Sequence, residues 1–387
     1  MENNKCDDKR FSRYIEILED FDAEHRFRTI PADRSDSLSI DLTSNDYLGI
    51  GANREMFNTD FNDLYPKASF SSSASRLLSR LQTHHDNLEQ MLGRLYGKEV
   101  ILFNSGYHAN VGTIQALNIP GTVFLCDKLI HASMIDGLSL SGAEYRRWRH
   151  NDLSSLEKLL QKYSDKERCI VVVESIYSMD GDETPLRELV LLKHRYPNMI
   201  LYVDEAHAFG VRGNKGLGIS EEYNLIEDVD ILIGTFGKAT ASSGAFVATN
   251  PILRHFLINC ARSFIFSTAI PPVNMAWTTH ILHYIVKMNR EREHLMRISA
   301  RFRKGIEEIT GERNVSTSQI VPLILGDAKK ALHLSARLST RGIDTLPIRR
   351  PTVPEGSERI RFSLSAALSE SQIEHILNII REELNDF

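Results

Sequence analysis

Short apolar runs alternate with helical patterns through the middle of the chain. The runs are apolar throughout and rich in β-branched residues, which is typical of strands buried on both faces of a parallel sheet. We predict strands at residues 99–103, 122–125, 169–173, 199–203, 231–233 and 245–248. Their alternation with helices predicts an α/β fold whose mainly parallel sheet is covered by helices.

The two ends of the chain carry different patterns. Residues 8–25 are charged, with apolar positions at helical spacing, and predict a helix in an N-terminal arm. After Pro271 and Pro272, a long helical pattern leads to a strand-like run at residues 319–325 and then to further helix and strand. The 387 residues exceed one ordinary core. We therefore expect three parts: an N-terminal arm at residues 1–45, a large domain at 46–270 and a smaller α+β C-terminal domain at 271–387.

Composition and charge exclude several classes of protein. Hydrophobic residues make up 42% of the chain and charged residues 25%, close to averages for globular proteins. A net charge of −5 provides no broad basic field for nucleic acid. The four cysteines are far apart and form no CxxC pair, which argues against a disulfide framework or a bound metal. No apolar stretch is long enough for a signal peptide or membrane span, so we expect a soluble cytoplasmic protein.

Candidate chemistry lies where the predicted strands end. Lys238 follows the apolar run at residues 229–233, and Asp204 and His207 follow the run at 199–203. Ligands of parallel α/β sheets bind beyond the carboxyl ends of the strands, where Glu174 would also lie. A lysine that forms a Schiff base and an acid that protonates a pyridine nitrogen are two requirements of pyridoxal phosphate. The pattern therefore favours this cofactor.

The third requirement is a phosphate site. The strand at 99–103 is followed by the turn Asn104-Ser105-Gly106 and by a predicted helix at 107–117. The start of a helix offers free N–H groups and a favourable dipole to a phosphate. Taken singly, Lys238 could be a solvated loop lysine, Asp204 a cap and His207 a hydrogen-bonded core histidine.

Four motifs resemble the α-oxoamine synthase family of fold-type I pyridoxal-phosphate enzymes. They are Asn45-Asp46-Tyr47-Leu48-Gly49, Asp204-Glu205-Ala206-His207, Phe236-Gly237-Lys238 and Phe266-Ser267-Thr268-Ala269-Ile270-Pro271-Pro272. The resemblance runs from about Asp41 to the C-terminus. It implies a seven-stranded sheet, bound pyridoxal 5'-phosphate and a homodimer with shared active sites.

The resemblance also implies roles for individual residues around the cofactor. Lys238 would carry the Schiff base, Asp204 would pair with the pyridinium nitrogen and His207 with the phenolic oxygen. His131 would stack on the ring and contact substrate, although alone it reads as a helix-start histidine. The remaining cofactor contacts would come from Gly106, Tyr107, Ser178, Thr235 and, reaching the neighbouring subunit, Thr268.

For the reaction, the resemblance implies a decarboxylative condensation of glycine or alanine with an acyl thioester carried on coenzyme A or acyl carrier protein. The substrate contacts would be Arg26, Asn45, His131, Arg349 and Thr352. We expect Arg349 to be the strongest of these, because a guanidinium matches a carboxylate bidentately.

The acyl donor is less sharply indicated. The segment 348–354 most resembles the family members that use a pimeloyl thioester in biotin biosynthesis, and this resemblance implies that donor. Ser71–Ala74 and Leu368 depart from the family pattern, so the acyl chain length stays open. Alternatives are an acetyl-CoA donor, another acyl donor, an aminotransferase or aldolase on the same fold, and a catalytically silent family subunit.

Overall fold

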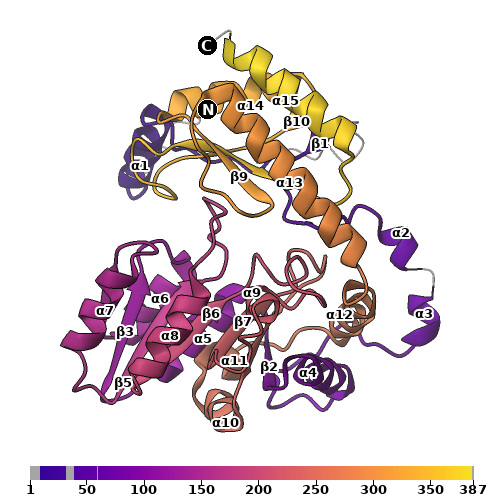
Figure 1. Cartoon of the computed structure of the whole chain (residues 1–387). Coiled ribbons are helices and arrows are strands. Elements are labelled where there is room, and N and C mark those ends of the chain that lie inside the picture. Colours follow the sequence, from indigo (N-terminus) through magenta and orange to yellow (C-terminus); the bar gives the residue numbers. More distant parts are fainter. Residues whose placement is uncertain (1–8, 32–38, 59, 386–387) are drawn as a thin grey trace.

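A seven-stranded sheet forms the centre of the larger part of the molecule in the computed structural model (Figure 1). The structure describes residues 9–31, 39–58 and 60–385. The strand order is β2-β8-β7-β6-β5-β3-β4. Strands β4, β3, β5, β6 and β7 are parallel to one another, and β8 runs antiparallel to both β7 and β2. The bounds are Glu99–Phe103 (β2), Thr122–Asp127 (β3), Tyr145–Trp148 (β4), Arg168–Glu174 (β5), Met199–Asp204 (β6), Ile231–Thr235 (β7) and Ala245–Thr249 (β8).

Six of these strands lie where the apolar runs predicted them, and the mainly parallel, helix-covered sheet is confirmed. Strand β4 has no counterpart among the predicted runs. It lies at the edge of the sheet and pairs only with β3. Its residues Arg146 and Arg147 are exposed, and only Trp148 is buried. A strand with a single buried residue has no apolar run to reveal it.

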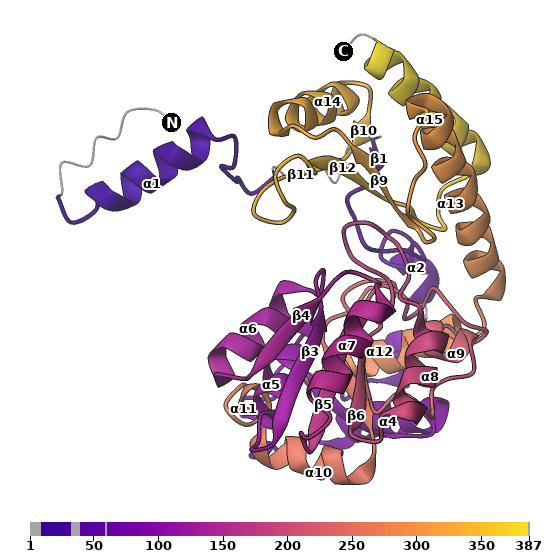
Figure 2. The same cartoon turned by 60° about the vertical axis from the view of Figure 1, so that its left-hand side comes forward.

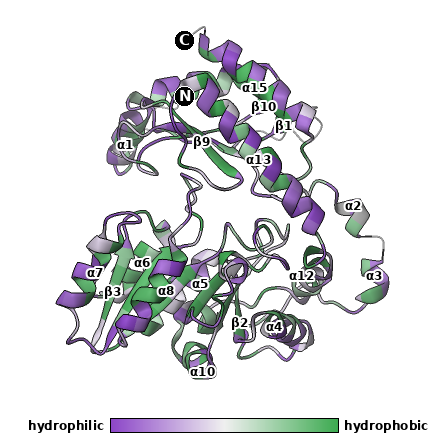
Figure 3. Ribbon diagram, in the orientation of Figure 1, coloured by the Kyte–Doolittle hydropathy of each residue, from purple (hydrophilic) through white to green (hydrophobic). Residues whose placement is uncertain are grey.

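Helices cover both faces of the sheet. One face packs against α5 (Gly106–Leu117), α6 (Ala132–Ser141), α10 (Pro251–Cys260) and α11 (Arg262–Ile265). The other face packs against α4 (Thr83–Tyr96), α7 (Leu153–Lys162), α8 (Leu186–Arg195) and α12 (Pro272–Ile285). Figure 3 shows the strands of the large sheet mostly in green, whereas the helices around them carry both green and purple segments. Burial on both faces explains why the strands read as continuous apolar runs.

The C-terminal unit is a second, smaller layer of sheet and helices. Strands β11 (Leu346–Ile348), β12 (Arg359–Ser363) and β9 (Ile320–Ile324) form an antiparallel sheet. Helices α13 (Asn289–Thr310), α14 (Ala328–Thr340) and α15 (Glu370–Asn385) pack with it (Figure 1). The predicted boundary at residue 270 stays a prediction; α12, which follows it, packs against α4 of the larger part.

The N-terminal residues join the C-terminal unit. Strand β1 (Ile40–Asp41) pairs in parallel with β10 (Ile343–Asp344). The predicted helix at 8–25 is observed as α1 (Ser12–Ala23), which has no buried residue and extends away from the rest of the chain (Figure 2). Residues 1–8 and 32–38 of the predicted arm lie outside the described residues. Short helices α2 (Arg54–Phe57), α3 (Phe61–Leu64) and α9 (Ile219–Glu222) complete the fold.

An aromatic cluster fixes the turn that carries Lys238. Phe236, directly after β7, stacks on Phe246 of β8 with ring centroids 5.6 Å apart, and Phe209 packs edge-on against Phe246 at 5.1 Å. A Cβ atom at Gly234 would lie 2.2 Å from the Phe246 ring. Glycine is therefore required at position 234, because the Phe246 ring lies against the backbone there. The same ring packs on Phe236 and so fixes the segment that leads to Lys238.

Candidate active site

Several chemically active residues meet at one edge of the large sheet. Strand β5 ends at Glu174 and β6 at Asp204, and these two residues are direct partners in the pairing of the strands. Strand β7 ends at Thr235, three residues before Lys238, and β2 leads into Ser105. The strand ends thus come together as the parallel arrangement requires.

Lys238 begins a chain of hydrogen bonds. Its Nζ lies 2.7 Å from Nε2 of His207, and Nδ1 of His207 lies 2.7 Å from the Tyr47 hydroxyl. The hydroxyl donates to Oδ1 of Asn45 at 2.8 Å. Because the only hydrogen of that hydroxyl goes to Asn45, Nδ1 of His207 must donate to Tyr47, which leaves Nε2 to accept from Lys238.

Burial lowers the pKa of both nitrogen bases in this chain. Burial lowers the pKa of Lys238 to about 8, although the charges of Asp204 and Glu174 oppose the shift. Burial and the neighbouring Lys238 charge bring the pKa of His207 well below its usual range. The imidazole therefore stays neutral, and the lysine amine is available as a base or nucleophile near neutral pH.

Asp204 is held in a fixed orientation by a buried polar network. Nδ2 of Asn110 donates to Oδ2 of Asp204 at 2.8 Å, and the backbone N–H of Ala206 donates to Oδ1 at 2.9 Å. Asn110 also donates to Oγ of Ser133 and accepts from the Tyr202 hydroxyl at 2.6 Å. The carboxylate is thereby fixed at the strand end.

His131 and Glu174 border this network. His131 is the N-cap residue of α6, and its Nδ1 lies 2.7 Å from Oγ of Ser133. Burial lowers the pKa of His131. Glu174 is buried, and burial followed by the charge of Asp204 raises its pKa well above the usual range. Within the described part of the chain, Oε1 of Glu174 has no hydrogen-bond partner.

Arg361 is a site residue that the sequence analysis missed. It is 3% exposed, and its Nη2 donates to Asn45 Oδ1 at 3.2 Å and to the Tyr47 hydroxyl at 3.4 Å. Its Nε donates to the carbonyl of Ser178 at 2.6 Å. The sequence Arg359-Ile360-Arg361-Phe362-Ser363 alternates charged and apolar residues, as a half-exposed strand would, so no local signal indicated a buried guanidinium.

The predicted phosphate site lies at the start of α5. Ser105 caps the helix by accepting from the N–H of His108. A Cβ atom at Gly106 would lie 3.7 Å from the side chain of Thr235, so the start of α5 lies directly beside that hydroxyl. The carbonyl of Thr268 accepts from Asn104 next to this turn, and Tyr107 is half exposed with its hydroxyl on Asp136.

Three predicted substrate residues lie apart from this cluster, beside the N-terminal segment. Arg349 donates to the carbonyls of His25 at 2.5 Å and Phe27 at 3.4 Å. Thr352 accepts from Arg28, and Arg26 pairs with Glu24 at 3.0 Å. Of the predicted substrate contacts, Asn45 and His131 thus lie with the cofactor residues, whereas the roles of Arg26, Arg349 and Thr352 stay predictions.

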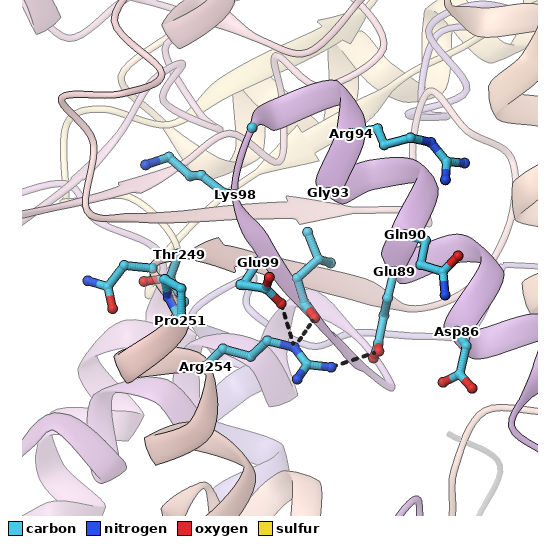
Figure 4. Close-up of a pocket in the computed structure, with 13 residues that line it drawn as sticks. Asp86, Glu89, Gln90, Gly93, Arg94, Lys98, Glu99, Thr249, Pro251 and Arg254 are labelled. Atoms are coloured by element: carbon cyan, nitrogen blue, oxygen red, sulfur yellow. Dashed lines mark hydrogen bonds and ion pairs between the residues drawn. The ribbon is translucent and has the colours of Figure 1, made fainter.

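A polar hollow of about 630 Å³ lies at the opposite end of the sheet, where β2 begins (Figure 4). Arg254 crosses it and donates to the carbonyl of Val100 at 2.7 Å and to Glu89 at 3.1 Å. Its Nε is also 3.7 Å from Glu99. These ion pairs and hydrogen bonds link α10 to α4 and β2. Their role is to hold these elements together, and they take no part in the site around Lys238.

Over residues 9–31, 39–58 and 60–385 no three His, Cys, Asp or Glu side chains are grouped as metal ligands. In the same part of the chain no helix combines the length and apolar character needed to span a membrane.

Comparison with known proteins gives the family. The model of class I and II aminotransferases matches residues 39–380, and the chain belongs to this family. Among its relatives, an 8-amino-7-oxononanoate synthase of Haemophilus ducreyi is 42% identical over 363 residues, which span 92% of this chain and 93% of that protein. The resemblance seen in the motifs is thereby confirmed.

Two solved structures share the whole fold. A serine palmitoyltransferase from S. paucimobilis, with bound PLP–myriocin aldimine, is 27% identical with a TM-score of 0.87 and covers 97% of this chain and 98% of its own. An 8-amino-7-oxononanoate synthase from Francisella tularensis is 29% identical with a TM-score of 0.74 and covers 90% of this chain and 98% of its own. The predicted fold class is confirmed.

Proposed function

We propose that this protein is a pyridoxal-phosphate-dependent acyltransferase of the α-oxoamine synthase type. Its preferred substrates would be alanine and a pimeloyl thioester, the reaction of an 8-amino-7-oxononanoate synthase in biotin biosynthesis. The relative of that name, which aligns with nearly the whole chain, supports this choice. The structural observation that carries the proposal is the hydrogen-bonded chain from Lys238 through His207 and Tyr47 to Asn45 and Arg361.

The residues present fit pyridoxal phosphate. Lys238 would form the covalent link, Asp204 would pair with the ring nitrogen, and the start of α5 at Gly106, beside Thr235, would take the phosphate. His131 would lie on the ring face, with Tyr107, Ser178 and His207 as further contacts. When bound, the cofactor draws electron density away from Cα of the amino acid.

The side chains of this protein would bind the amino acid and transfer the protons. Arg361 and Asn45 would hold the amino-acid carboxylate, since the guanidinium is buried, charged and joined to the Lys238 chain. Lys238, with its pKa near 8, would take the proton from Cα and return one at the end of the reaction. Neutral His207 would keep its Nε2 lone pair directed at the amine whenever Lys238 is free.

The acyl thioester, on coenzyme A or acyl carrier protein, would approach past the N-terminal segment. Arg26, Arg28 and Arg349 lie close to one another there, and burial followed by the Arg28 charge lowers the pKa of Arg349. Repulsion between Arg28 and Arg349 would be relieved by an anionic group of the substrate, and Arg26 lines the same hollow as Arg349. We assign Arg26, Arg349 and Thr352 to the acyl substrate on this ground.

We also propose a homodimer. Phe70, Leu78 and Phe266 are 84%, 78% and 71% exposed. Their segments are adjacent, because Ser75 forms a β-bridge with Thr268. Exposed large apolar side chains on adjacent segments are typical of a protein interface, and a second copy would bring Thr268 toward the neighbouring site. Buried free thiols at Cys126 and Cys169 suit the reducing cytoplasm, where we place the enzyme.

The test is release of the free thiol from pimeloyl-CoA by the purified protein with pyridoxal phosphate and alanine. Parallel reactions use acetyl-CoA with glycine, and Lys238→Ala serves as the inactive control. Release that depends on pimeloyl-CoA, alanine and Lys238 supports the proposal. A preference for acetyl-CoA and glycine would move the assignment to an acetyltransferase, and no release with either donor would overturn the acyltransferase assignment.

A further inference from the structure

His150 lies between two carboxylates outside the residues assigned so far. It follows the edge strand β4, and its Nδ1 is 2.9 Å from Oδ1 of Asp127. Its Nε2 is 2.7 Å from Oδ2 of Asp182. Asp127 ends β3 and is fully buried, whereas Asp182 belongs to the loop after β5. One ring thus joins two separate parts of the fold.

Both ring nitrogens of His150 must carry hydrogen in this arrangement. The second oxygen of Asp127 accepts the N–H of Asn151 at 2.9 Å, and Nδ2 of Asn151 donates to Asp182 at 2.8 Å. Nδ2 of Asn151 also lies 3.3 Å from Nε2, but its two hydrogens are donated to Asp182 and to the carbonyl of Glu183. Each ring nitrogen therefore faces a carboxylate that only accepts, which is the environment of an imidazolium. The Tyr177 ring packs edge-on against His150 with centroids 4.4 Å apart. Burial lowers the pKa of His150, but the hydrogen bonds and charges of Asp127 and Asp182 outweigh it and raise the pKa to about 10.

Asp182 belongs to a tightly bonded loop, residues 175–183. The N–H of Tyr177 donates to the carbonyl of Asp182 at 3.0 Å, and the N–H of Gly181 donates to the carbonyl of Tyr177 at 2.9 Å. A β-bridge joins Ile176 to Glu183 at the base of the loop. Fixing Asp182 and Tyr177 therefore fixes the loop as one body.

The far side of this loop touches the C-terminal unit. The carbonyl of Ser178 accepts from Arg361, and Asp180 pairs with Arg359. The carbonyl of Gly181 accepts from the N–H of Thr317 at 3.1 Å. A Cβ atom at Gly181 would lie 2.0 Å from the Ile320 carbonyl oxygen, and the residue has φ +69°, so only glycine allows this approach. The loop thus connects the large sheet to the strand that carries Arg361.

We propose that His150 is a positioning residue that, as an imidazolium bonded to Asp127 and Asp182, holds the loop 175–183 against the large sheet and so sets the position of Arg361. The guanidinium of Arg361 is bonded to the Ser178 carbonyl on one side and to Asn45 on the other. A displaced loop would remove one of the bonds that orient it. The consequence for catalysis rests on the proposed function; the positioning of the loop does not.

The experiment compares His150→Gln and Asp182→Asn with His194→Gln. His194 is a matched control because it pairs with Asp228, at 3.2 Å, on the exposed surface of the same domain. Hydrogen–deuterium exchange of peptides covering residues 175–183 reads the loop without any substrate. We expect exchange there to rise by about tenfold or more in both test variants and to stay at the wild-type rate in the control. The Michaelis constant for the amino acid should rise about tenfold, with a smaller change in kcat.

Nitrogen-15 spectra of histidine-labelled protein report the protonation of the ring in the wild type itself, and comparison with the spectrum of Asp182→Asn assigns the His150 signal. Two protonated ring nitrogens on His150 at pH 8 support the proposal, and a neutral ring at that pH overturns it. Unchanged exchange of residues 175–183 in His150→Gln also overturns it. Because neither readout involves substrate, absence of acyltransferase activity would refute the proposed function while leaving this inference to be decided by exchange and spectra.

Discussion

The amine of Lys238 and the imidazole of His207 share a hydrogen bond of 2.7 Å between Nζ and Nε2. His207 can only accept in this bond, since its other nitrogen donates to the Tyr47 hydroxyl. A neutral, accepting imidazole next to a buried amine keeps the lysine oriented without adding positive charge. The state of these two residues makes the reactivity of Lys238 sensitive to pH in a range where ordinary lysines are fully charged.

Uptake of pyridoxal phosphate by the cofactor-free protein should follow the ionisation of Lys238. The pKa of this lysine is lowered from 10.5 to about 8, and only the uncharged amine attacks an aldehyde. The rate of uptake, followed by the visible absorbance of the bound cofactor, should therefore rise with pH and reach half its plateau near pH 8. If the rate of uptake reached half its maximum only above pH 10, burial would not lower the pKa of Lys238 as described.

Tyr47→Phe should lower kcat while leaving the fold intact. The substitution removes the hydroxyl that accepts from His207 and from Arg361. A buried donor left without a partner costs about 1–3 kcal/mol, so we expect activity to fall by roughly tenfold or more. Tyr14→Phe, on the exposed α1, is the control and should keep wild-type activity. Full activity in Tyr47→Phe would contradict the hydrogen-bonded chain.

Arg361→Lys and Arg349→Lys should distinguish the carboxylate site proposed at Arg361 from the one predicted from sequence at Arg349. Arg361 is bonded to Asn45 within the Lys238 chain, whereas Arg349 is bonded to backbone carbonyls of the N-terminal segment. A lysine cannot reproduce a forked guanidinium. We expect Arg361→Lys to raise the Michaelis constant for the amino acid by about tenfold or more and Arg349→Lys to leave it nearly unchanged. The reverse order would return the carboxylate role to Arg349.

The stability contributed by His150 should depend on pH with a definite sign. Its pKa is raised from 6.5 in the unfolded chain to about 10 in the fold, so its contribution is complete below pH 6.5 and is lost as pH rises through 10. The difference in Tm between wild type and His150→Gln should therefore be largest near pH 6 and shrink as the pH approaches 10. A difference that grows with pH would contradict the imidazolium assignment.

Gly234→Ala should destabilise the fold by overpacking. The added methyl group would lie 2.2 Å from the Phe246 ring, and crowding of this kind costs about 1–3 kcal/mol. The double variant Gly234→Ala with Phe246→Leu has room for the methyl group. Denaturant unfolding should show that the double variant loses less stability than the sum of the two single variants. Strict additivity would mean that the two positions do not compete for space.

The fold could be predicted from the sequence wherever burial leaves a continuous apolar run. The run at residues 199–203 is such a case, because strand β6 is covered on both faces. Strand β4 could not be found in this way, since Arg146 and Arg147 face solvent and the strand exists only through pairing with β3. The pairing of β1 with β10 is likewise a contact between distant segments that no local pattern encodes.

The residues of the candidate site also differ in whether a local sequence pattern could predict them. Lys238, Asp204 and His207 could be proposed because they follow recognisable strands. Arg361 could not, because its burial results from Asn45 and Ser178, which reach it from other parts of the chain. Arg349 has the chemistry expected of a carboxylate ligand, but chemistry alone does not place a side chain, and its described bonds are made elsewhere.

The pairing of β1 with β10 also determines the order in which the protein is completed during synthesis. The large sheet, residues 99–249, emerges from the ribosome with all of its strands and can begin to fold at once. Ile40 and Asp41 emerge earlier, yet they must wait for Ile343 and Asp344 near the end of the chain. Asn45 and Tyr47 lie just beyond β1, so their partner Arg361 reaches them only after nearly every residue has been added. The candidate site is therefore completed last, and a nascent chain truncated before residue 361 would hold Lys238, Asn45 and Tyr47 without the guanidinium of Arg361.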